Sequence, residues 1–191
     1  MRKNILHIKG AQEIPFQPRE ILDRLIKLYG PLNWRQRRDP VSELVATILS
    51  QHTSDLNADR AFEQLIKTFG SLYRVADADI QLLALSINSG GLSRQKAPRI
   101  KNALNWIIQK RGALNLDFLR ELSLSDAKSW LTEIPGVGPK TAAVVLCFSL
   151  GMPAFPVDTH VHRVTKRLGL IGHNVTADQA HDLLERMLDP G

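Results

Sequence analysis

Apolar residues recur at spacings of three and four along almost the whole chain, whereas the alternation that is typical of strands is scarce. This periodicity predicts an all-α protein. The stretch that starts at Pro18 carries its apolar residues on one stripe and stops at Gly30, as a helix with a glycine end does. A more apolar stretch begins with Asp39 in the N-cap position and Pro40 in the first turn, which predicts a buried helix.

Further stretches along the chain show the same helical spacing and end at glycines, prolines or polar turns. No repeat of solenoid type and no low-complexity linker separates them. We expect these additional helices over residues 54–70, 77–87, 93–112, 123–134, 140–151, 158–170 and 176–188.

Composition narrows the class of protein without identifying a partner. The chain has 191 residues, 43% of them hydrophobic, which is enough to bury a core. Its 25 basic and 19 acidic side chains give a net charge of +6, which suits a polyanionic partner but does not demonstrate one. Because no apolar run is long enough for a signal sequence or a membrane span, we expect a cytoplasmic protein without a membrane partner.

The residues that most often bind metals are few and scattered. The single cysteine, Cys147, excludes a disulfide within the chain and any metal or iron–sulfur site built from several of its cysteines. His160 and His162 are two residues apart in a predicted helix and therefore face different ways. We expect no metal site.

Residues 134–145, "IPGVGPKTAAVV", predict two helices joined by a glycine-rich turn. Glycines at this turn allow positive φ and a close approach of the backbone to a ligand, while unpaired N–H groups point toward the positive end of the second helix. Such a turn can hold a phosphate. A Walker A loop is excluded because Pro139 separates Gly138 from Lys140, and a dinucleotide fingerprint would need a glycine in place of Thr141. A turn whose glycines serve packing only remains the alternative.

Lys140 stands at the start of the second of these helices. The positive end of a helix dipole disfavours a protonated ammonium, and we expect partial burial to act in the same direction. A neutral amine is a nucleophile, so this position favours a chemical role. A lysine that simply extends its amine to solvent is the competing interpretation.

Asp158 occupies the N-cap position of another predicted helix, eighteen residues further on, in "PVDTHVHRV". An aspartate at this position is ordinary as a helix cap. A carboxylate held near a nucleophilic amine would equally serve as an acid, a base or an electrostatic partner in chemistry at a sugar. The position alone leaves both interpretations open.

Four stretches together resemble one family: "IPGVGPKTA", "VDTHVHRV", "ILSQHTSD" and "GGLSRQKA". They are similar to the motifs of helix-hairpin-helix DNA glycosylases of the endonuclease III branch, and the similarity extends over roughly residues 35–188. The resemblance implies an all-α fold of two lobes. Residues 39–152 would form a six-helix barrel lobe that ends in the hairpin, and residues 1–38 plus 153–191 a discontinuous second helical lobe, with a cleft between them.

The resemblance also implies roles for single residues. Lys140 takes the place of the Schiff-base nucleophile of the bifunctional enzymes, and Asp158 that of their essential aspartate. Leu92 takes the place of an apolar wedge that enters the base stack, although it could simply be a hydrophobe that caps the following helix. The residues expected to contact DNA are Gly136, Val137, Gly138, Thr141, Gln51, His52, Leu92 and His160. Further contacts to the backbone of the duplex could come from Arg94, Lys96, Arg163, Lys166 and the "WRQRR" segment that begins at Trp34, although for each of them singly a solvated surface charge is the more ordinary interpretation.

Two departures from the family pattern affect the interpretation. Gln51 and His52 both stand where the family usually has one glutamine, so either side chain could fill the gap left by a flipped nucleotide. Most relatives carry four cysteines that hold a [4Fe-4S] cluster beyond the last helix seen here. We therefore expect no cluster in this chain as given, which is either naturally short or lacks a C-terminal part.

The function implied by the resemblance is base-excision repair of double-stranded DNA by a monomer. The enzyme would flip out a damaged base, with oxidised pyrimidines as the commonest substrate class, and cleave the N-glycosidic bond through a Schiff base on Lys140. It would then nick the abasic site by β-elimination, without a metal. The alternatives are a monofunctional mismatch glycosylase and a non-catalytic DNA-binding module that uses the hairpin alone.

Overall fold

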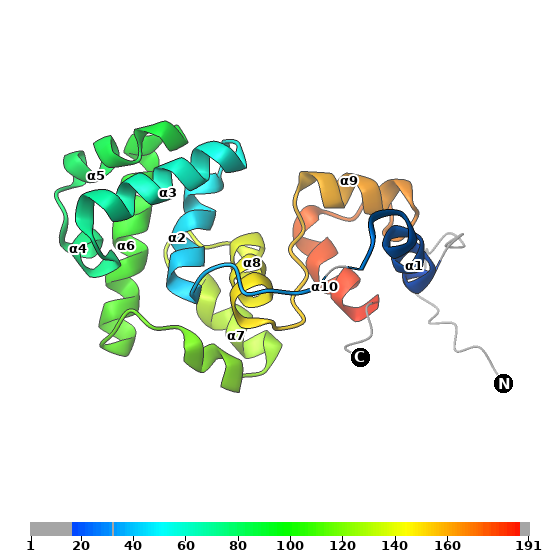
Figure 1. Ribbon diagram of the computed structural model, residues 1–191. Coiled ribbons are helices and arrows are strands. Elements are labelled where there is room, and N and C mark those ends of the chain that lie inside the picture. Colours follow the sequence, from blue (N-terminus) through cyan, green and yellow to red (C-terminus); the bar gives the residue numbers. More distant parts are fainter. Residues whose placement is uncertain (1–16, 32, 188–191) are drawn as a thin grey trace. The chain divides into compact units, whose positions relative to one another are not determined.

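The computed structural model describes residues 17–31 and 33–187, and every regular element in these ranges is a helix, as the periodicity predicts. The chain forms two compact units (Figure 1). We call Arg35–Ala154 the large unit, and Met1–Trp34 together with Phe155–Gly191 the split unit. The sequence-based boundaries of 39–152 differ from these by a few residues at each end.

The large unit contains all six helices expected within it and one that the sequence analysis missed, the six-residue α4. A helix this short leaves almost no periodicity to detect, and its signal is the cap that Ser71 forms by accepting a hydrogen bond from the amide of Arg74. The helices are α2 (Pro40–Ser50), α3 (Asp55–Phe69), α4 (Leu72–Asp77), α5 (Ile80–Ser86), α6 (Ser93–Arg111), α7 (Leu124–Thr132) and α8 (Pro139–Leu150). Two 3₁₀ helices, η1 (Asn88–Gly90) and η2 (Asp117–Glu121), complete the unit.

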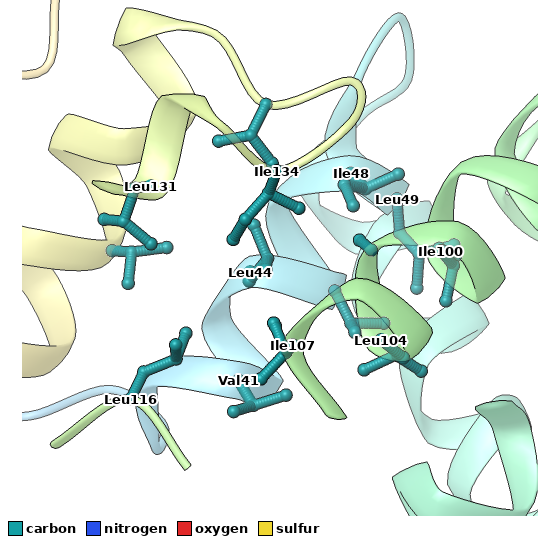
Figure 2. Packing of buried hydrophobic residues seen from close by; sticks show 14 of the residues in the cluster. Val41, Leu44, Ile48, Leu49, Ile100, Leu104, Ile107, Leu116, Leu131 and Ile134 are labelled. Carbon is teal, nitrogen blue, oxygen red and sulfur yellow. The ribbon is translucent and has the colours of Figure 1, made fainter. Parts of the chain in front are cut away.

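Helix α2 lies at the centre of the large unit. Nine of its eleven residues are buried, and it packs against α3, α6 and α8. Figure 2 shows Leu44 and Ile48 of α2 beside Ile100 and Leu104 of α6 within this core. The prediction of a buried helix that begins after an Asp39 cap is confirmed, because Asp39 accepts a hydrogen bond from the amide of Ser42 at 3.0 Å.

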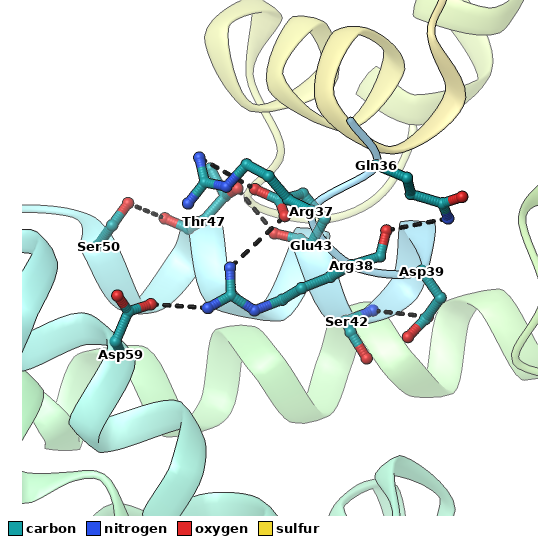
Figure 3. A network of polar contacts seen from close by, with 9 residues as sticks. All are labelled: Gln36, Arg37, Arg38, Asp39, Ser42, Glu43, Thr47, Ser50 and Asp59. Carbon is teal, nitrogen blue, oxygen red and sulfur yellow. Dashed lines mark hydrogen bonds and ion pairs between the residues drawn. The ribbon is translucent and has the colours of Figure 1, made fainter. Parts of the chain in front are cut away.

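A buried glutamate of α2 forms ion pairs with the segment that precedes this helix. The side chain of Glu43 is 2% exposed. Its Oε1 lies 3.7 Å from Nη1 of Arg37, and its Oε2 lies 3.6 Å from Nη1 of Arg38 (Figure 3). Arg38 also donates to Asp59 of α3 at 2.7 Å. The "WRQRR" segment was expected to contact DNA, but two of its arginines are used inside the unit because a buried carboxylate requires cationic partners.

The split unit contains α1 (Pro18–Tyr29), α9 (Thr159–Arg167) and α10 (Ala177–Met187). Its small core consists of Val157, Leu170, Ile171, Ala180 and Leu184. No residue of α1 is buried, although Ile21 packs against this core. Within the described residues, no helix is long and apolar enough to cross a membrane.

Candidate functional site

The hairpin between α7 and α8 is built by one left-handed glycine and one extended glycine. Gly136 has a φ of 83°, and the turn is closed by a hydrogen bond from the amide of Val137 to the carbonyl of Ile134 at 3.0 Å. Gly138 is the N-cap of α8, with a φ of −99° and a ψ of 178°. The expectation that both glycines use positive φ is therefore wrong for Gly138, because any residue adopts that extended backbone.

The fold itself gives no reason for a glycine at position 138. A Cβ at Gly138 would meet no heavy atom within 4 Å, so the space in front of α8 is open. No side chain caps this helix, whereas Asp39, Ser54 and Asp158 cap α2, α3 and α9. The first-turn amides of α8 therefore face open space at the positive end of a helix, which is the geometry that binds phosphate.

The side chains of Val137 and Thr141 anchor the hairpin rather than reach outward. Val137 is 6% exposed and Thr141 is 5% exposed, and Val137 belongs to the core of the large unit. Both were expected to contact DNA. Because their side chains are buried and the amide of Val137 closes the turn, the group that remains to face a ligand is the backbone amide of Thr141 in the first turn of α8.

Lys140 is the second residue of α8 and its side chain is exposed. The expected partial burial of this lysine is therefore wrong. The rest of α8 is tightly packed, with seven of its twelve residues buried. The amine is thus carried by a rigid helix next to the phosphate-binding geometry of the hairpin, and it is open to an incoming substrate.

Asp158 caps α9 as predicted. Its Oδ1 accepts a hydrogen bond from the amide of Val161 at 2.7 Å, and the residue is partly buried. This aspartate belongs to the split unit and Lys140 to the large unit. Each residue stands at the N-terminal end of a helix.

Two residues of α10, which the sequence analysis missed, hold the segment that leads into Asp158. Glu185 accepts a hydrogen bond from the amide of Phe155 at 2.8 Å, and Nδ1 of His181 lies 2.8 Å from the carbonyl oxygen of Phe155. His181 is 2% exposed. Their spacing of four residues on an amphipathic helix was the available signal, since it places both on one face. Asp158 thus follows a segment that is fixed by side chains from α10.

His160 lies in the first turn of α9 and is exposed. Its Nδ1 accepts a hydrogen bond from the guanidinium of Arg163 at 2.9 Å. Both residues are therefore available at the surface of the split unit, in agreement with the surface position that a DNA contact requires.

A hollow of about 440 Å³ in the large unit brings together Gln51, His52 and Leu92, the three residues predicted to act where a nucleotide is flipped out. They come from the end of α2 and the start of α6, which are some forty residues apart in the sequence. The remaining residues that line it are Gln95, Lys96 and Arg99.

Strained backbone marks both sides of this hollow. His52 has a φ of 55° and Leu92 a φ of 50°, and within the described residues they are the two non-glycine residues with positive φ. Each such residue costs about 1–3 kcal/mol and persists only where its surroundings enforce it. Leu92 is the N-cap of α6 but provides no side-chain cap, and it is 47% exposed. Its side chain is thus held at the surface rather than packed over the helix that follows.

Lys96 was expected to contact the DNA backbone, but its side chain is buried. It is 1% exposed, and its ammonium donates to the carbonyl oxygens of Leu49 at 2.6 Å and of Gly90 at 2.7 Å. Burial lowers the pKa of this lysine. Of the basic residues in "GLSRQKA", only Arg94 remains exposed and available to a phosphate.

Arg99 connects the hollow to the hairpin and was not predicted from the sequence. Its Nη1 donates to Oε1 of Gln51 at 3.0 Å. Its aliphatic stem runs beside the hairpin, where a Cβ built on Gly136 would lie 3.8 Å from Cγ of Arg99. One side chain therefore contacts both the phosphate-binding turn and one of the two candidates for filling the gap in the duplex.

Nothing among the described residues forms a metal site, since no three histidine, cysteine, aspartate or glutamate side chains gather there. Cys147, the one cysteine of the sequence, lies half-buried within α8, and burial raises the pKa of its thiol. A cluster held by four thiolates does not fit a chain with a single cysteine.

The sequence matches the family described as HhH-GPD superfamily base excision DNA repair protein over residues 45–190. A putative DNA glycosylase of Arabidopsis thaliana is 38% identical over 157 residues, which cover 82% of this chain and 54% of that protein. The chain thus spans about half the length of this relative. Endonuclease III of Thermotoga maritima is 34% identical over 88% of this chain and 74% of that protein, and endonuclease III of Sulfolobus acidocaldarius is 34% identical over 88% and 71%.

Solved structures agree with the sequence comparison. A non-covalent endonuclease III–DNA complex superimposes with a TM-score of 0.74 at 28% identity, covering 90% of this chain and 76% of that one. A trapped endonuclease III–DNA covalent intermediate gives a TM-score of 0.73 at 27% identity, with the same coverage. This chain therefore belongs to the HhH-GPD superfamily of base excision DNA repair proteins, within which it is similar to endonuclease III.

Proposed function

We propose that this protein is a bifunctional DNA glycosylase that removes a damaged base from duplex DNA and then cleaves the strand at the abasic site. The observation that carries this proposal is the exposed amine of Lys140 at the start of α8, in a first turn that no side chain caps. The endonuclease III of the trapped complex, to which this chain is similar, forms a covalent intermediate with DNA. This similarity supports a nucleophilic residue in this chain as well.

Binding begins with the phosphate backbone. The amides of the first turn of α8 receive a phosphate, and the exposed cation of Arg94 adds a contact. Leu92 inserts between base pairs, and Gln51 or His52 occupies the space that the flipped nucleotide leaves. A damaged base stacks and pairs poorly, so its extrusion costs less than that of a normal base.

The chemistry needs one amine and one carboxylate. The neutral amine of Lys140 attacks C1′ of the deoxyribose, and the C1′–N bond to the base breaks as the base leaves with the bonding pair. Asp158 stabilises the positive charge that develops on the sugar and accepts the proton that the attacking amine releases. The sugar ring then opens to give an imine between Lys140 and C1′.

Strand cleavage follows from this imine. It acidifies the C2′ hydrogen, and loss of that proton expels the 3′ phosphate with the C3′–O bonding pair. Water then hydrolyses the imine and regenerates the amine of Lys140. We propose oxidised pyrimidines in duplex DNA as the substrate class and a monomer as the active form.

The experiment is borohydride trapping on duplex DNA that contains an abasic site. Reduction of the imine would leave a covalent protein–DNA adduct that Lys140→Ala abolishes. Lys67→Ala is the matched control, because Lys67 is an exposed lysine on α3 of the same unit and should leave the adduct unchanged. A wild-type protein that binds this DNA but forms no adduct would contradict the lyase step and leave the monofunctional alternative, in which Lys140 performs no covalent chemistry.

A further inference from the structure

Lys96 is buried, and within residues 17–31 and 33–187 its ammonium has no anionic partner, which is a costly arrangement for a cation. Burial lowers the pKa of this lysine, and the ammonium donates to the backbone carbonyls of Leu49 and Gly90. Leu49 lies in the last turn of α2, and Gly90 is the last residue of η1. Carbonyls at helix ends lack internal partners and carry partial negative charge, so the ammonium stabilises two helix ends at once.

Each of these carbonyls stands just before one of the strained residues. Leu49 precedes His52 by three positions, and Gly90 precedes Leu92 by two. Leu49 and Lys96 are 47 residues apart in the sequence, so the contact joins two turns that the chain itself does not connect. Through one ammonium, the turn with Gln51 and His52 is tied to the turn with Leu92.

The packing around Gly90 shows how closely the two turns approach. A Cβ at Gly90 would lie 3.1 Å from Cβ of Ala61 and 3.9 Å from the carbonyl oxygen of Leu49. A side chain at this position would be tight against Ala61 of α3, so α3 or η1 would have to shift by a few tenths of an ångström. A glycine at position 90 therefore suits the close approach of the two turns, whose carbonyls one lysine reaches.

We propose that Lys96 is a positioning residue that holds the two turns around the hollow as one rigid unit, so that Leu92 and Gln51 or His52 enter a duplex together. This rests on the proposed function, in which these side chains replace a flipped nucleotide. Lys96 touches neither the DNA nor the reacting atoms. It acts by keeping two strained backbones in the geometry that opens a base pair.

The same helix provides a matched control. Lys101 also donates its ammonium to a backbone carbonyl, that of Ala78 at the end of α4, and it does not line the hollow. Replacement of either lysine by methionine removes one cation and keeps the unbranched apolar part of the side chain. Loss of stability from a missing carbonyl contact is therefore common to both variants, whereas loss of the rigid turns is specific to Lys96→Met.

The test compares Lys96→Met, Lys96→Arg and Lys101→Met on two DNA substrates. One is a duplex with an oxidised pyrimidine, which must be opened; the other is a single strand with a preformed abasic site, which has no pair to open. We expect Lys96→Met to lower the ratio of the duplex rate to the single-strand rate by ~10- to 100-fold, because misplacement of about 1 Å costs that much. Lys101→Met should keep the wild-type ratio. Lys96→Arg retains donors for both carbonyls, so its ratio of duplex rate to single-strand rate should lie closer to the wild-type value than that of Lys96→Met.

Equal losses on both substrates would overturn the proposal, because Lys96 would then support the fold in general. An unchanged ratio in Lys96→Met would overturn it as well. If Lys96→Met does not fold, Lys96→Arg takes its place: rates that fall equally on both substrates would overturn the proposal, whereas a ratio at or below the wild-type value with the single-strand rate kept would support it.

A readout without catalysis separates this proposal from the proposed function. 2-Aminopurine placed opposite a stable abasic analogue reports directly on the side chains that enter the duplex. If the wild type shows no lyase activity but changes this fluorescence, and Lys96→Met does not, the proposed chemistry fails and the positioning role stands. If neither protein changes the fluorescence, the positioning role fails.

Discussion

The guanidinium of Arg99 donates to Oε1 of Gln51 at 3.0 Å. Arginine has donors only, so the acceptor in this contact is the oxygen of the Gln51 amide, and its NH₂ group takes no part in it. A glutamine held in this way offers donors, rather than an acceptor, to the base that loses its partner.

We therefore expect Arg99→Met to reduce discrimination among the four bases opposite the lesion, because the Gln51 amide can then rotate. The loss of one hydrogen bond is worth about 1 kcal/mol, or roughly fivefold in relative kcat/KM. Single-turnover rates with each opposite base measure it. Arg60→Met, which removes an exposed arginine of α3, should keep the wild-type order of preference. An undiminished preference in Arg99→Met would assign the reading of the opposite base to another residue, with His52 the first candidate.

The two hairpin glycines should respond differently to alanine. Gly136→Ala places a Cβ on a residue with a φ of 83°, which costs about 1–2 kcal/mol of unfolding free energy. Gly138→Ala has ordinary backbone and no heavy atom within 4 Å, so it should destabilise the protein less but weaken DNA binding, since the new methyl stands where the phosphate approaches. Denaturant titration and equilibrium binding of an abasic duplex give the two quantities. Full DNA affinity in Gly138→Ala would remove this hairpin from the interface.

Asp158 has a structural and a chemical role that two substitutions separate. Asn is as good an N-cap as Asp, so Asp158→Asn should keep the unfolding free energy within a few tenths of a kcal/mol, whereas Asp158→Ala should lose about 1 kcal/mol. Both variants should lose base excision by ~10²- to 10⁴-fold, because neither can accept a proton or stabilise a cation as a carboxylate does. Thermal unfolding and single-turnover excision measure the two effects. Excision in Asp158→Asn that equals the wild type would reduce the residue to a helix cap.

The buried ammonium of Lys96 should make stability depend on pH in a defined direction. Burial lowers its pKa in the folded state, so between that value and the ordinary value of 10.5 the unfolded chain binds the extra proton. Stability contributed by this residue therefore rises as pH increases toward 10.5, where the cost of burying a charge is relieved. The measurement is the difference in unfolding free energy between wild type and Lys96→Met at pH 7.5 and at higher pH. If the unfolding free energy of the wild type instead decreases relative to that of Lys96→Met as pH rises, the ammonium gains more from its carbonyl contacts than it loses by burial.

Much of the fold could be predicted because its signals are local. Helix α2 begins at an aspartate followed by proline, and α9 begins at Asp158, so the caps identify both starts within a few residues. The missed helix α4 has six residues and too few apolar positions for any periodicity to stand out. The hairpin motif likewise identified Lys140 and Gly136 correctly as neighbours, because the turn and the helix after it are contiguous in the chain.

The sequence by itself determined the all-helical class, most of the helices and the motif that contains Lys140, since hydrophobic spacing and capping act between residues a few positions apart. Only the tertiary structure decided that Lys96 is buried against two carbonyls, that Arg99 holds Gln51, and that His52 and Leu92 share one hollow. The contact of Lys96 with Leu49 spans 47 positions in the sequence and that of Arg99 with Gln51 spans 48, although Lys96 and Gly90 are only six apart. Whether a cation faces solvent or a carbonyl depends on what packs over it, and this packing is decided by the fold as a whole.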